Sequence, residues 1–387
     1  MKIVQISSGY YPDLGGIEAH IQLLSEALVR RGHQVTVLAE SRRRDLAPVE
    51  WIDGVEVRRF PAVGRGVYRY PSGMLRYLRA HAGAWDVAHA HNFHALPLIL
   101  ACVARPAPLV LSLYYHGKGH TSLANLLHRL YVPATRGLIR RAERIVCVSE
   151  AETALVSRTF GLGPRQVSIV PVIVALVDEA HASAELPLLA EVRTPTSLLS
   201  VGRMAPHKRM DRLIAALPHL PATYTLTLVG DGPERERLER LAERYGVRSR
   251  VHLAGRVSDA DLRAWYRRAG ALASLSEAES FGRTIIEGLA LGCRVVCSDI
   301  PAHREFARRY PAWVTLVPPD ASDGQLATLI DATVRRETGA PPDLRPYTRS
   351  AITDSMLAIY AAAARSGASR ARQAVVVEVA GDAHRHS

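Results

Sequence analysis

The stretch "GALASLSEAESFGRTIIEGLALGCRVVCSD", residues 270–299, predicts a strand, a loop, a helix and a second strand in that order. "GALASLS" and "CRVVCS" are short apolar runs of strand length, and "RTIIEGLALG" between them is helical. Two strands joined through a helix form a βαβ unit, whose strands lie parallel. The loop "EAESFG" therefore follows the carboxyl end of a strand.

The same alternation of strand and helix extends over most of the chain, in two series. The first series begins with "KIVQIS" and the second with "TSLLSVG", and strand-like runs alternate with helical patterns up to about residue 335. We therefore expect an α/β protein of two doubly wound, Rossmann-like domains. Open sheets of this kind bind ligands beyond the carboxyl ends of their strands, so we expect one large cleft between the domains.

The domain boundaries are predicted where prolines bound a segment that lacks the alternating pattern of strands and helices. We expect a first domain at 1–172, a linker at 173–195 and a second domain at 196–345. A helix at about 350–364 and a disordered tail at 366–387 follow.

Composition limits the class of protein. The chain has 387 residues, enough for two domains, and 48% of them are hydrophobic. No run approaches the roughly 18 apolar residues of a membrane span, and no signal-peptide pattern begins the chain, so we expect a soluble, cytoplasmic protein. The cysteines lie in apolar contexts without the spacing of a zinc site, so buried thiols are expected. They are Cys102, Cys147, Cys293 and Cys297.

The formal net charge of +12 is uneven. Residues 1–170 hold 21 Lys and Arg against 12 Asp and Glu, so +9 belongs to the first half. The pI near 9.9 raises nucleic-acid binding as an alternative. Its basic residues are mostly spread over helix faces without interleaved aromatic residues, which argues against that class. Only Lys2, Lys118 and Lys208 are lysines, which makes the two internal ones functional candidates.

Cations follow the first strand of the second half. "SVGRMAPHKRMDRLIAAL" ends a strand at Gly202 and then places Arg203 and Lys208 before an amphipathic helix. Two cations at a helix N-terminus predict an anion site. "VGDGPERERLERLA" places Asp231 in the next such loop, where a tight turn and a capped helix account for the pattern equally well.

The loop of the opening stretch carries two glutamates with separate predicted roles. Glu287, in the first turns of the helix, can accept both hydroxyls of a ribose, and Glu279 in the loop can accept hydroxyls of a second ring. The amides of Ser280, Phe281 and Gly282 are expected to face an anion between them. An acid that merely favours the helix N-terminus is the alternative for Glu287.

Candidates in the first half are fewer. Gly15 and Gly16 allow close approach of a ligand at the first helix N-terminus, and "YYHGKGHT" places His116 and Lys118 after a strand. The histidines of "HAHNFH" are expected in the core or lining the cleft rather than on a metal; they are His89, His91 and His94.

An Asp-x-Asp pair also occurs. In "SDADLRAWYRR", Asp259 and Asp261 follow a serine that can cap a helix, so the sequence predicts a helix start there and no metal site.

With these motifs the chain resembles the retaining nucleotide-sugar glycosyltransferases of the large GT-B family that includes bacterial mannosyl-, glucosyl- and N-acetylglucosaminyltransferases. The similarity spans about residues 1–335 and is most specific from 198 to 299. Its carriers are "GGIEAH", "DVAHAHN", "HG", "VCVSE", "VGRMAPHKRMDRLIAAL", "VGDGPERERLERLA" and the run from "VHLAGRVSDADL" to "CRVVCSD".

The resemblance implies roles for single residues. Arg203 and Lys208 would hold the donor diphosphate, Glu287 the ribose and Glu279 the transferred sugar. Gly16 would contact the phosphate, and His116 would line the sugar and acceptor side.

The resemblance also implies the rest of the site. Asp13 and Lys118 would lie on the acceptor side. No cofactor or catalytic metal is expected, and the helix at 350–364 would return to the first domain.

The implied reaction moves a hexosyl or N-acetylhexosaminyl group from a UDP- or GDP-sugar to a hydroxyl, with retention. The acceptor would be a lipid-linked glycan, a polysaccharide or a small natural product. The basic run "LHRLYVPATRGLIRRAER" suggests peripheral contact with a membrane, with a solvated helix face as the alternative. A same-fold epimerase or phosphorylase is the second reading, although no acid arrangement for it is seen.

Three positions depart from the family pattern. Arg283 stands where an aliphatic residue is common, and Arg294 where proline is usual. "VPVIVAL" replaces the usual Asn-Gly after the interdomain strand, which leaves the hinge contacts open.

Overall fold

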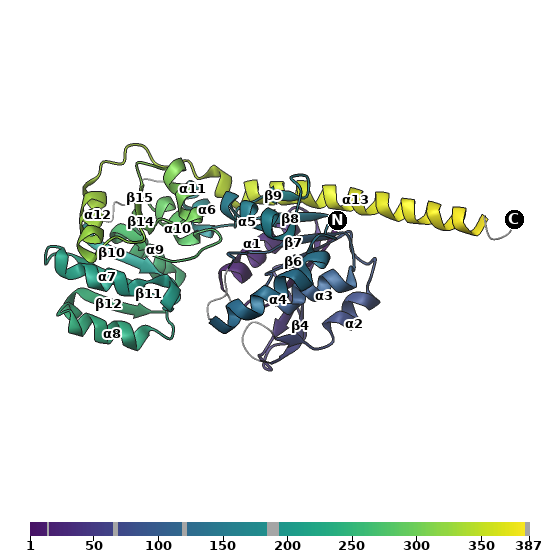
Figure 1. Ribbon diagram of the computed structural model, residues 1–387, viewed down its shortest axis with the longest axis horizontal. Coiled ribbons are helices and arrows are strands. Elements are labelled where there is room, and N and C mark those ends of the chain that lie inside the picture. Colours follow the sequence, from purple (N-terminus) through teal and green to yellow (C-terminus); the bar gives the residue numbers. More distant parts are fainter. Residues whose placement is uncertain (14, 65–68, 118–121, 184–192, 384–387) are drawn as a thin grey trace. The chain divides into compact units, whose positions relative to one another are not determined.

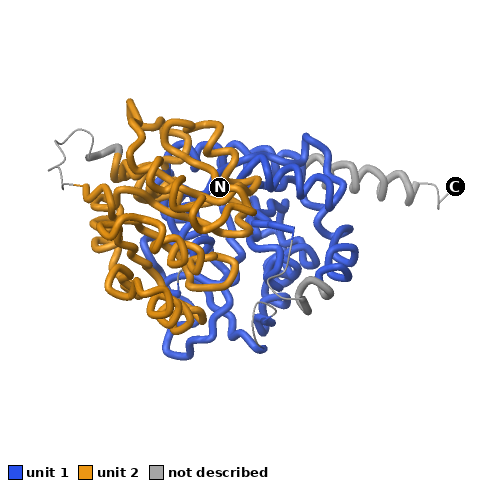
Figure 2. The backbone as a smooth tube through the Cα atoms, turned by 60° about the vertical axis from the view of Figure 1, so that its left-hand side comes forward, with its two compact units in different colours: residues 1–173, 349–387 blue, residues 174–348 orange. Residues whose placement is uncertain are grey.

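A computed structural model of the protein describes residues 1–13, 15–64, 69–117, 122–183 and 193–383 (Figure 1). It divides into two compact units, shown in different colours in Figure 2. Unit 1 comprises residues 1–173 and 349–387, and unit 2 comprises residues 174–348.

The sheet of unit 1 has the strand order β3-β4-β2-β1-β6-β7-β8-β9, and β5 pairs with β4. The β3–β4 and β4–β5 pairs are antiparallel, and the other pairs are parallel. Its strands are β1 (Lys2–Ser7), β2 (Gln34–Ser41), β3 (Val49–Ile52), β4 (Val55–Val63), β5 (Tyr70–Pro71), β6 (Val87–His91), β7 (Leu109–Ser112), β8 (Arg144–Cys147) and β9 (Val167–Ile169).

Helices cover both faces of this sheet. Buried residues of α1 and α13 form one apolar cluster with β1 and β2, and those of α2, α3, α4 and α5 form a second cluster with β6 and β7. The helices are α1 (Gly16–Arg30), α2 (Met74–Ala80), α3 (Leu96–Ala104), α4 (Ser122–Ile139), α5 (Glu150–Phe160) and α13 (Arg349–Ala383).

The hairpin β3–β4 is absent from the sequence-based prediction. Its turn is Asp53-Gly54, whose φ angles are 47° and 78°. An Asp-Gly pair between strand-like runs is a strong hairpin signal, because the tight turn requires positive φ at both positions. That signal was present in the sequence and would have identified the edge strand β3 and its neighbour β4.

Helix α13 is longer than predicted. It runs from Arg349 to Ala383, whereas the sequence predicted a helix to about 364 and a disordered tail. The disordered tail at 366–387 stays a prediction. The segment is rich in alanine, the best helix former, and contains no proline that would stop the helix.

The sheet of unit 2 is entirely parallel, with the order β12-β11-β10-β13-β14-β15. The order reverses beside β10, which is the switch point of a doubly wound fold. The strands are β10 (Thr194–Val201), β11 (Thr225–Val229), β12 (Val251–Gly255), β13 (Ala269–Ser274), β14 (Arg294–Ser298) and β15 (Val314–Val317).

Helices α7, α8 and α12 pack on one face of this sheet in a single core cluster. Right-handed crossovers after the reversal place α9 and α10 on the other face. The helices are α6 (Ala175–Ser183), α7 (Met210–Ala216), α8 (Arg235–Arg244), α9 (Asp259–Arg268), α10 (Arg283–Ala290), α11 (Pro301–Arg309) and α12 (Asp323–Arg335), with short 3-10 turns such as η1 (Pro206–Lys208) and η3 (Arg248–Arg250).

The segment predicted as a linker, 173–195, contains helix α6. Glu179 in α6 pairs with Arg263 in α9 at 3.0 Å, so this helix belongs to unit 2. Residues 184–192 of the predicted linker lie outside the described residues.

All four cysteines are buried and unpaired, as the sequence predicts. Burial raises the pKa of the Cys102 thiol to about 12. No helix within the described residues combines the length and apolar character needed to cross a bilayer.

Candidate functional site

The candidate residues of unit 2 follow the carboxyl ends of neighbouring parallel strands. Lys208 lies in the turn η1 after β10, and Glu279 lies in the loop after β13. Strands β10 and β13 are paired in the sheet, so the two loops leave it side by side. The sequence could place each residue after a strand, whereas only the sheet order brings the two strands together.

Glycines allow the loops after β10 and β11 to pack backbone against backbone. A Cβ atom at Gly230 would lie 2.0 Å from the carbonyl oxygen of Gly202, and one at Gly232 would lie 2.3 Å from that of Met204. The amide of Met204 donates to the carbonyl of Asp231 at 3.0 Å. The "VGDG" glycines are therefore required by close packing.

Lys208 and Glu279 form the central ion pair of the site. The Nζ atom of Lys208 donates to Oε1 of Glu279 at 2.5 Å, and both side chains are about one-fifth exposed, at 23% and 22%. The resemblance assigned these residues to different parts of one ligand. The structure places them in direct contact.

The charge of Glu279 is maintained against its burial. Burial by itself raises the pKa of this carboxyl, but Lys208 with its hydrogen bond, the nearby His303 and Ser276 together lower the pKa below its usual value. The carboxylate is therefore ionised at neutral pH and able to accept hydroxyl donors.

Helix α10 starts directly after this loop. Gly282 is its N-cap, with φ 103°, and Phe281 packs edge-on against Phe306 with ring centroids 5.5 Å apart. No side chain caps the helix, so the first amides of α10 are available to an anion. The structure thus places Ser280, Phe281 and Gly282 between Glu279 and the helix.

Glu287 lies one turn further along α10 and is 5% exposed. Its Oε2 accepts from the hydroxyl of Tyr266 in α9 at 2.8 Å, and its Oε1 accepts from Nε of Arg283 at 2.8 Å. Each carboxylate oxygen retains a second lone pair for a ligand hydroxyl. Arg283, the departure from the family pattern, is thus the charge partner of Glu287.

Arg203 and Asp231 behave differently from one another. Arg203 is exposed and forms no ion pair with any residue that the structure describes, so its guanidinium is available to an anionic ligand. The Oδ1 atom of Asp231 accepts from the amide of Gly232 at 2.8 Å, which closes its own turn. This contact favours the structural explanation for Asp231.

The candidates of unit 1 are placed by α1 and by the loop after β7. Gly15 is the N-cap of α1, and a Cβ atom at Gly16 would meet nothing within 4 Å. Asp13 is exposed, 3.8 Å from Arg43. The ring of His116 lies 5.9 Å from that of His94. Lys118 lies outside the described residues.

Glu152, which the sequence did not single out, holds the chain just before His116. Its carboxylate accepts from the amides of Tyr115 at 2.6 Å and Val148 at 2.7 Å. Burial raises the pKa of Glu152 to about 7 against these hydrogen bonds. A buried carboxyl that binds two strand-end amides fixes the loop that carries His116.

His89 and His91 belong to a buried hydrogen-bond network. Nδ1 of His89 lies 2.8 Å from the hydroxyl of Tyr360 in α13, and Nε2 of His91 lies 2.7 Å from Oε1 of Gln5. Burial first, and then neighbouring histidines, lower the pKa of both rings well below the usual value. They are neutral core residues, one of the two roles that the sequence predicted.

The Asp-x-Asp pair starts a helix, as expected. Ser258 is the N-cap of α9 and accepts from the amide of Asp261 at 3.2 Å. Within the described part of the chain, no three His, Cys, Asp or Glu side chains are grouped to hold a metal ion.

Three residues of this region escaped the sequence-based prediction. Tyr266 and Arg283 hold Glu287, and His303 in α11 lies beside Glu279. The imidazole of His303 is fully buried, and its Nε2 has no hydrogen-bond partner in the described residues. The anomalous arginine at 283 was the one visible signal, because the other two contacts depend on how helices pack.

Comparison with known proteins agrees with this architecture. The model of glycosyl transferases group 1 matches residues 189–349, and the model of glycosyltransferase family 4 matches residues 14–176. Glycogen synthase of Mycobacterium tuberculosis is 26% identical over 83% of this chain and 84% of its own length. Phosphatidyl-myo-inositol mannosyltransferase of Mycolicibacterium smegmatis is 29% identical over 85% and 84%.

Solved structures show the same fold. Sucrose-phosphate synthase from Thermosynechococcus elongatus superposes with a TM-score of 0.70 at 21% identity, covering 93% of this chain and 98% of the other. Anabaena HepE in complex with UDP-glucose gives a TM-score of 0.65 at 19% identity, covering 96% and 100%.

The two Rossmann-like units therefore define a GT-B fold. The chain belongs to the family 4-like glycosyltransferases of that fold, and it is an enzyme that transfers a glycosyl group. None of the relatives named here is an epimerase.

Proposed function

We propose that the enzyme transfers a hexosyl or N-acetylhexosaminyl group from a UDP- or GDP-sugar to an acceptor hydroxyl, with retention and without a metal. The observation that carries the proposal is the contact of Lys208 with Glu279 beside the uncapped N-terminus of α10. A cation, a hydroxyl-accepting carboxylate and free amides are the groups that a diphosphate joined to a sugar requires. One structural neighbour was solved with UDP-glucose, which supports this class of donor.

The chemical role of these residues follows from charge. Cleavage of the bond from the anomeric carbon to the phosphate leaves negative charge on the diphosphate. Arg203, Lys208 and the first amides of α10 stabilise that charge, and one contact at about 4 Å is worth roughly 4 kcal/mol at an effective dielectric of 20. These cations take the place of the metal that other transferases use.

Glu287 and Glu279 contact the two parts of the donor other than the diphosphate, namely the ribose and the transferred sugar. Glu287 is held by Tyr266 and Arg283 with its oxygens fixed, which suits a bidentate contact with the ribose hydroxyls. Glu279 lies in the loop and accepts hydroxyls of the transferred sugar. The leaving phosphate is the base for the acceptor hydroxyl in this proposal.

In this proposal, unit 1 binds the acceptor. Helix α4 contains no Asp or Glu, and exposed arginines line it and the turn that follows. We assign the acceptor to a glycan or lipid-linked hydroxyl at an anionic surface, for which the inositol-lipid mannosyltransferase among the relatives is a precedent. The exposed arginines are Arg129, Arg136, Arg140 and Arg141.

The test is a thermal-shift panel of UDP, GDP, ADP and their sugar derivatives on the full chain. A ligand that binds only the folded state raises the melting temperature by mass action. We expect UDP or GDP and its sugar to stabilise the protein, and transfer from that sugar to a lipid or glycan acceptor to follow. Stabilisation by none of them, with the fold intact, would refute the donor class.

A further inference from the structure

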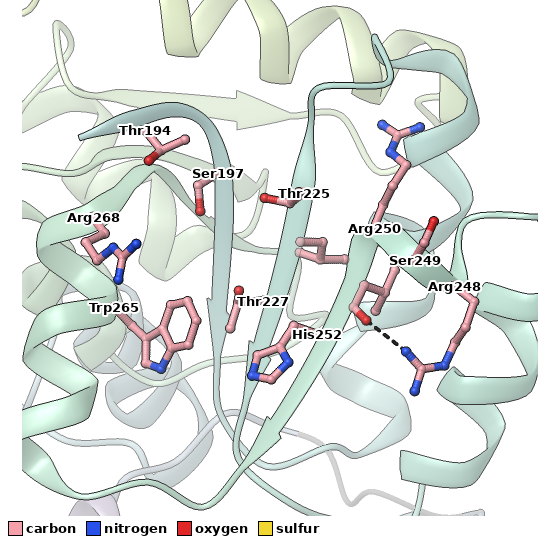
Figure 3. A pocket seen from close by; sticks show the side chains of 12 residues that line it. Thr194, Ser197, Thr225, Thr227, Arg248, Ser249, Arg250, His252, Trp265 and Arg268 are labelled. Carbon is pink, nitrogen blue, oxygen red and sulfur yellow. Dashed lines mark hydrogen bonds between the residues drawn. The ribbon is translucent and has the colours of Figure 1, made fainter. Parts of the chain in front are cut away.

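A polar cavity of about 520 Å³ opens on the sheet of unit 2, away from the donor residues (Figure 3). Its strand residues lie in the first halves of β10 and β12 and among the first three residues of β11. The proposed donor residues follow the carboxyl ends, and strands rise roughly 3.3 Å per residue. From Ser197 to the end of β10 at Val201 this is roughly 13 Å, so the cavity is separate from the donor site.

The floor of the cavity is a row of hydroxyl groups. "TLTLV" in β11 alternates polar and apolar residues: Leu226 and Leu228 enter the core, whereas Thr225 and Thr227 line the cavity. A parallel strand covered on both faces is normally apolar throughout. The alternation therefore marks a part of this sheet face, beside α9, that the helices leave open to the cavity. The floor hydroxyls are those of Thr194, Ser197, Thr225 and Thr227.

These hydroxyls are available to a ligand. None of the four forms a side-chain hydrogen bond with another residue that the structure describes. Thr227 is only 5% exposed as a residue, but its hydroxyl is not among the buried side-chain oxygens that lack a partner, so it can be reached from the cavity. Each hydroxyl both donates and accepts, which matches the hydroxyls of a sugar.

The walls add an aromatic surface and positive charge. Trp265 and Arg268, one turn apart on α9, form one side, and the ring of His252 lies 5.6 Å from that of Trp265. The opposite side carries Arg248 and Ser249 (Figure 3). Among the described residues that line the cavity, none is Asp or Glu.

The arginines of the walls have different roles. Arg250 donates to the carbonyls of Tyr224 at 2.8 Å and Pro221 at 2.9 Å, so it fixes the wall. Arg248 donates to the carbonyl of Val251 at 3.2 Å and keeps its other donors. Arg268 is exposed and forms no ion pair within the described residues. The planar guanidinium of Arg268 suits bidentate contact with an oxyanion.

We propose that this cavity is a second saccharide site, specific for a sugar that carries an anionic group. The indole face of Trp265 packs against the C–H face of a pyranose ring, whose weakly positive hydrogens meet the negative π surface. The threonine and serine hydroxyls bind sugar hydroxyls, and Arg268 binds the carboxylate or phosphate. The site requires neither donor nor turnover, so it goes beyond the proposed transfer reaction.

Binding to the full chain tests the proposal. The probes are an oligogalacturonate, a neutral malto-oligosaccharide of equal length, glucose 6-phosphate and inorganic phosphate, titrated by calorimetry without a nucleotide. We expect an anionic saccharide to bind more tightly than the neutral one. Oligogalacturonate against glucose 6-phosphate then distinguishes a carboxylate from a phosphate as the anionic group.

Substitutions locate the site. Arg268→Gln should weaken binding of the anionic saccharide about tenfold or more and leave binding of the neutral one unchanged, because the variant loses only a hydrogen bond to the anionic group. Thr227→Val keeps the shape of the side chain and its preference for a strand but removes the hydroxyl. It should weaken binding of both saccharides severalfold. Arg240→Gln, which removes one charge from an exposed pair on α8, is the matched control and should change nothing.

Two results would overturn the site. Inorganic phosphate that binds as tightly as the sugar phosphate would show an anion site without saccharide recognition. Saccharide binding that neither Arg268→Gln nor Thr227→Val weakens would place the sugar elsewhere. Transfer to a short acceptor should be unchanged in both variants, because the cavity lies outside the donor site. Absence of any transfer in the unmodified enzyme refutes the proposed function and leaves the binding result intact.

Discussion

Lys208 donates a hydrogen bond of 2.5 Å to Glu279, which joins the proposed phosphate contact directly to the proposed sugar contact. The pair spans two loops that lie 71 residues apart in sequence. A donor that uses both residues has to insert its own oxygens beside this contact. The contact therefore orients both side chains and keeps the Glu279 carboxylate charged.

The cations next to the donor should dominate catalysis. Lys208→Ala and Arg203→Ala should each lower kcat by about two to three orders of magnitude, because each removes charge stabilisation of the leaving diphosphate. Arg237→Ala, an exposed cation on α8, is the control. Turnover within a fewfold of normal in both site variants, with circular dichroism unchanged, would remove the diphosphate assignment.

The pair should also make stability depend on pH in a specific direction. The folded pKa of Glu279 lies below its usual 4.5, so its contribution is fully present above about pH 4.5 and is lost as the pH falls through the folded value. In Lys208→Met the burial of the carboxyl raises its pKa instead. The variant should therefore lose more unfolding free energy at pH 7 than at pH 4, measured by urea denaturation. An equal loss at both values would contradict the coupling.

Substitution of the two glutamates should affect binding of different parts of the donor. Glu287→Gln should weaken binding of the bare nucleoside diphosphate and of the sugar nucleotide alike, because both carry the ribose. Glu279→Ala should bind the nucleoside diphosphate normally but transfer poorly, because its contact matters once the sugar is positioned. Calorimetric titration with both ligands decides the matter. Equal losses for both ligands in both variants would assign the pair a structural role.

Activity should persist in excess EDTA, because Arg203 and Lys208 supply the positive charge on the diphosphate. The measurement is the initial transfer rate after extensive dialysis against the chelator. Loss of activity that manganese or magnesium restores would contradict the proposal. An Asp259→Asn, Asp261→Asn double variant should retain activity, since the two residues begin helix α9.

The network beneath α13 should make unit 1 sensitive to acid. The folded pKa values of His89 and His91 are held well below 6.5, so the unfolded chain binds more protons as the pH falls below about 6.5. Unfolding free energy should then decrease by up to about 1.4 kcal/mol per pH unit for each histidine. His89→Gln should flatten this dependence between pH 7 and 5. An unchanged slope would show that His89 does not contribute.

Tyr360 connects this network to α13, 271 residues beyond His89. The sequence predicted a helix near residue 360, and the resemblance implied that it returns to the first domain. Neither could show that its tyrosine hydroxyl would bond to His89 and Gln5. Those contacts depend on the side-chain positions of three distant segments.

The sequence by itself determined the succession of strands and helices and the family. Apolar runs such as "KIVQIS" and "CRVVCS" match strands closely, because a buried parallel strand must be apolar throughout. The sequence also placed Lys208 and Glu279 after strands, because loops at carboxyl ends bind ligands in such folds. The Asp53-Gly54 hairpin was equally visible in the sequence but was not recognised.

The tertiary structure alone decided which of these residues meet. The pairing of β10 with β13 brings Lys208 to Glu279, and the packing of α9 on α10 brings Tyr266 to Glu287. The hydroxyl floor beside Trp265 likewise requires two strands, β10 and β11, in register beside one helix. Local patterns fix the period of each element, whereas contacts between elements depend on strand order and on side-chain packing across tens of residues, which no local pattern specifies.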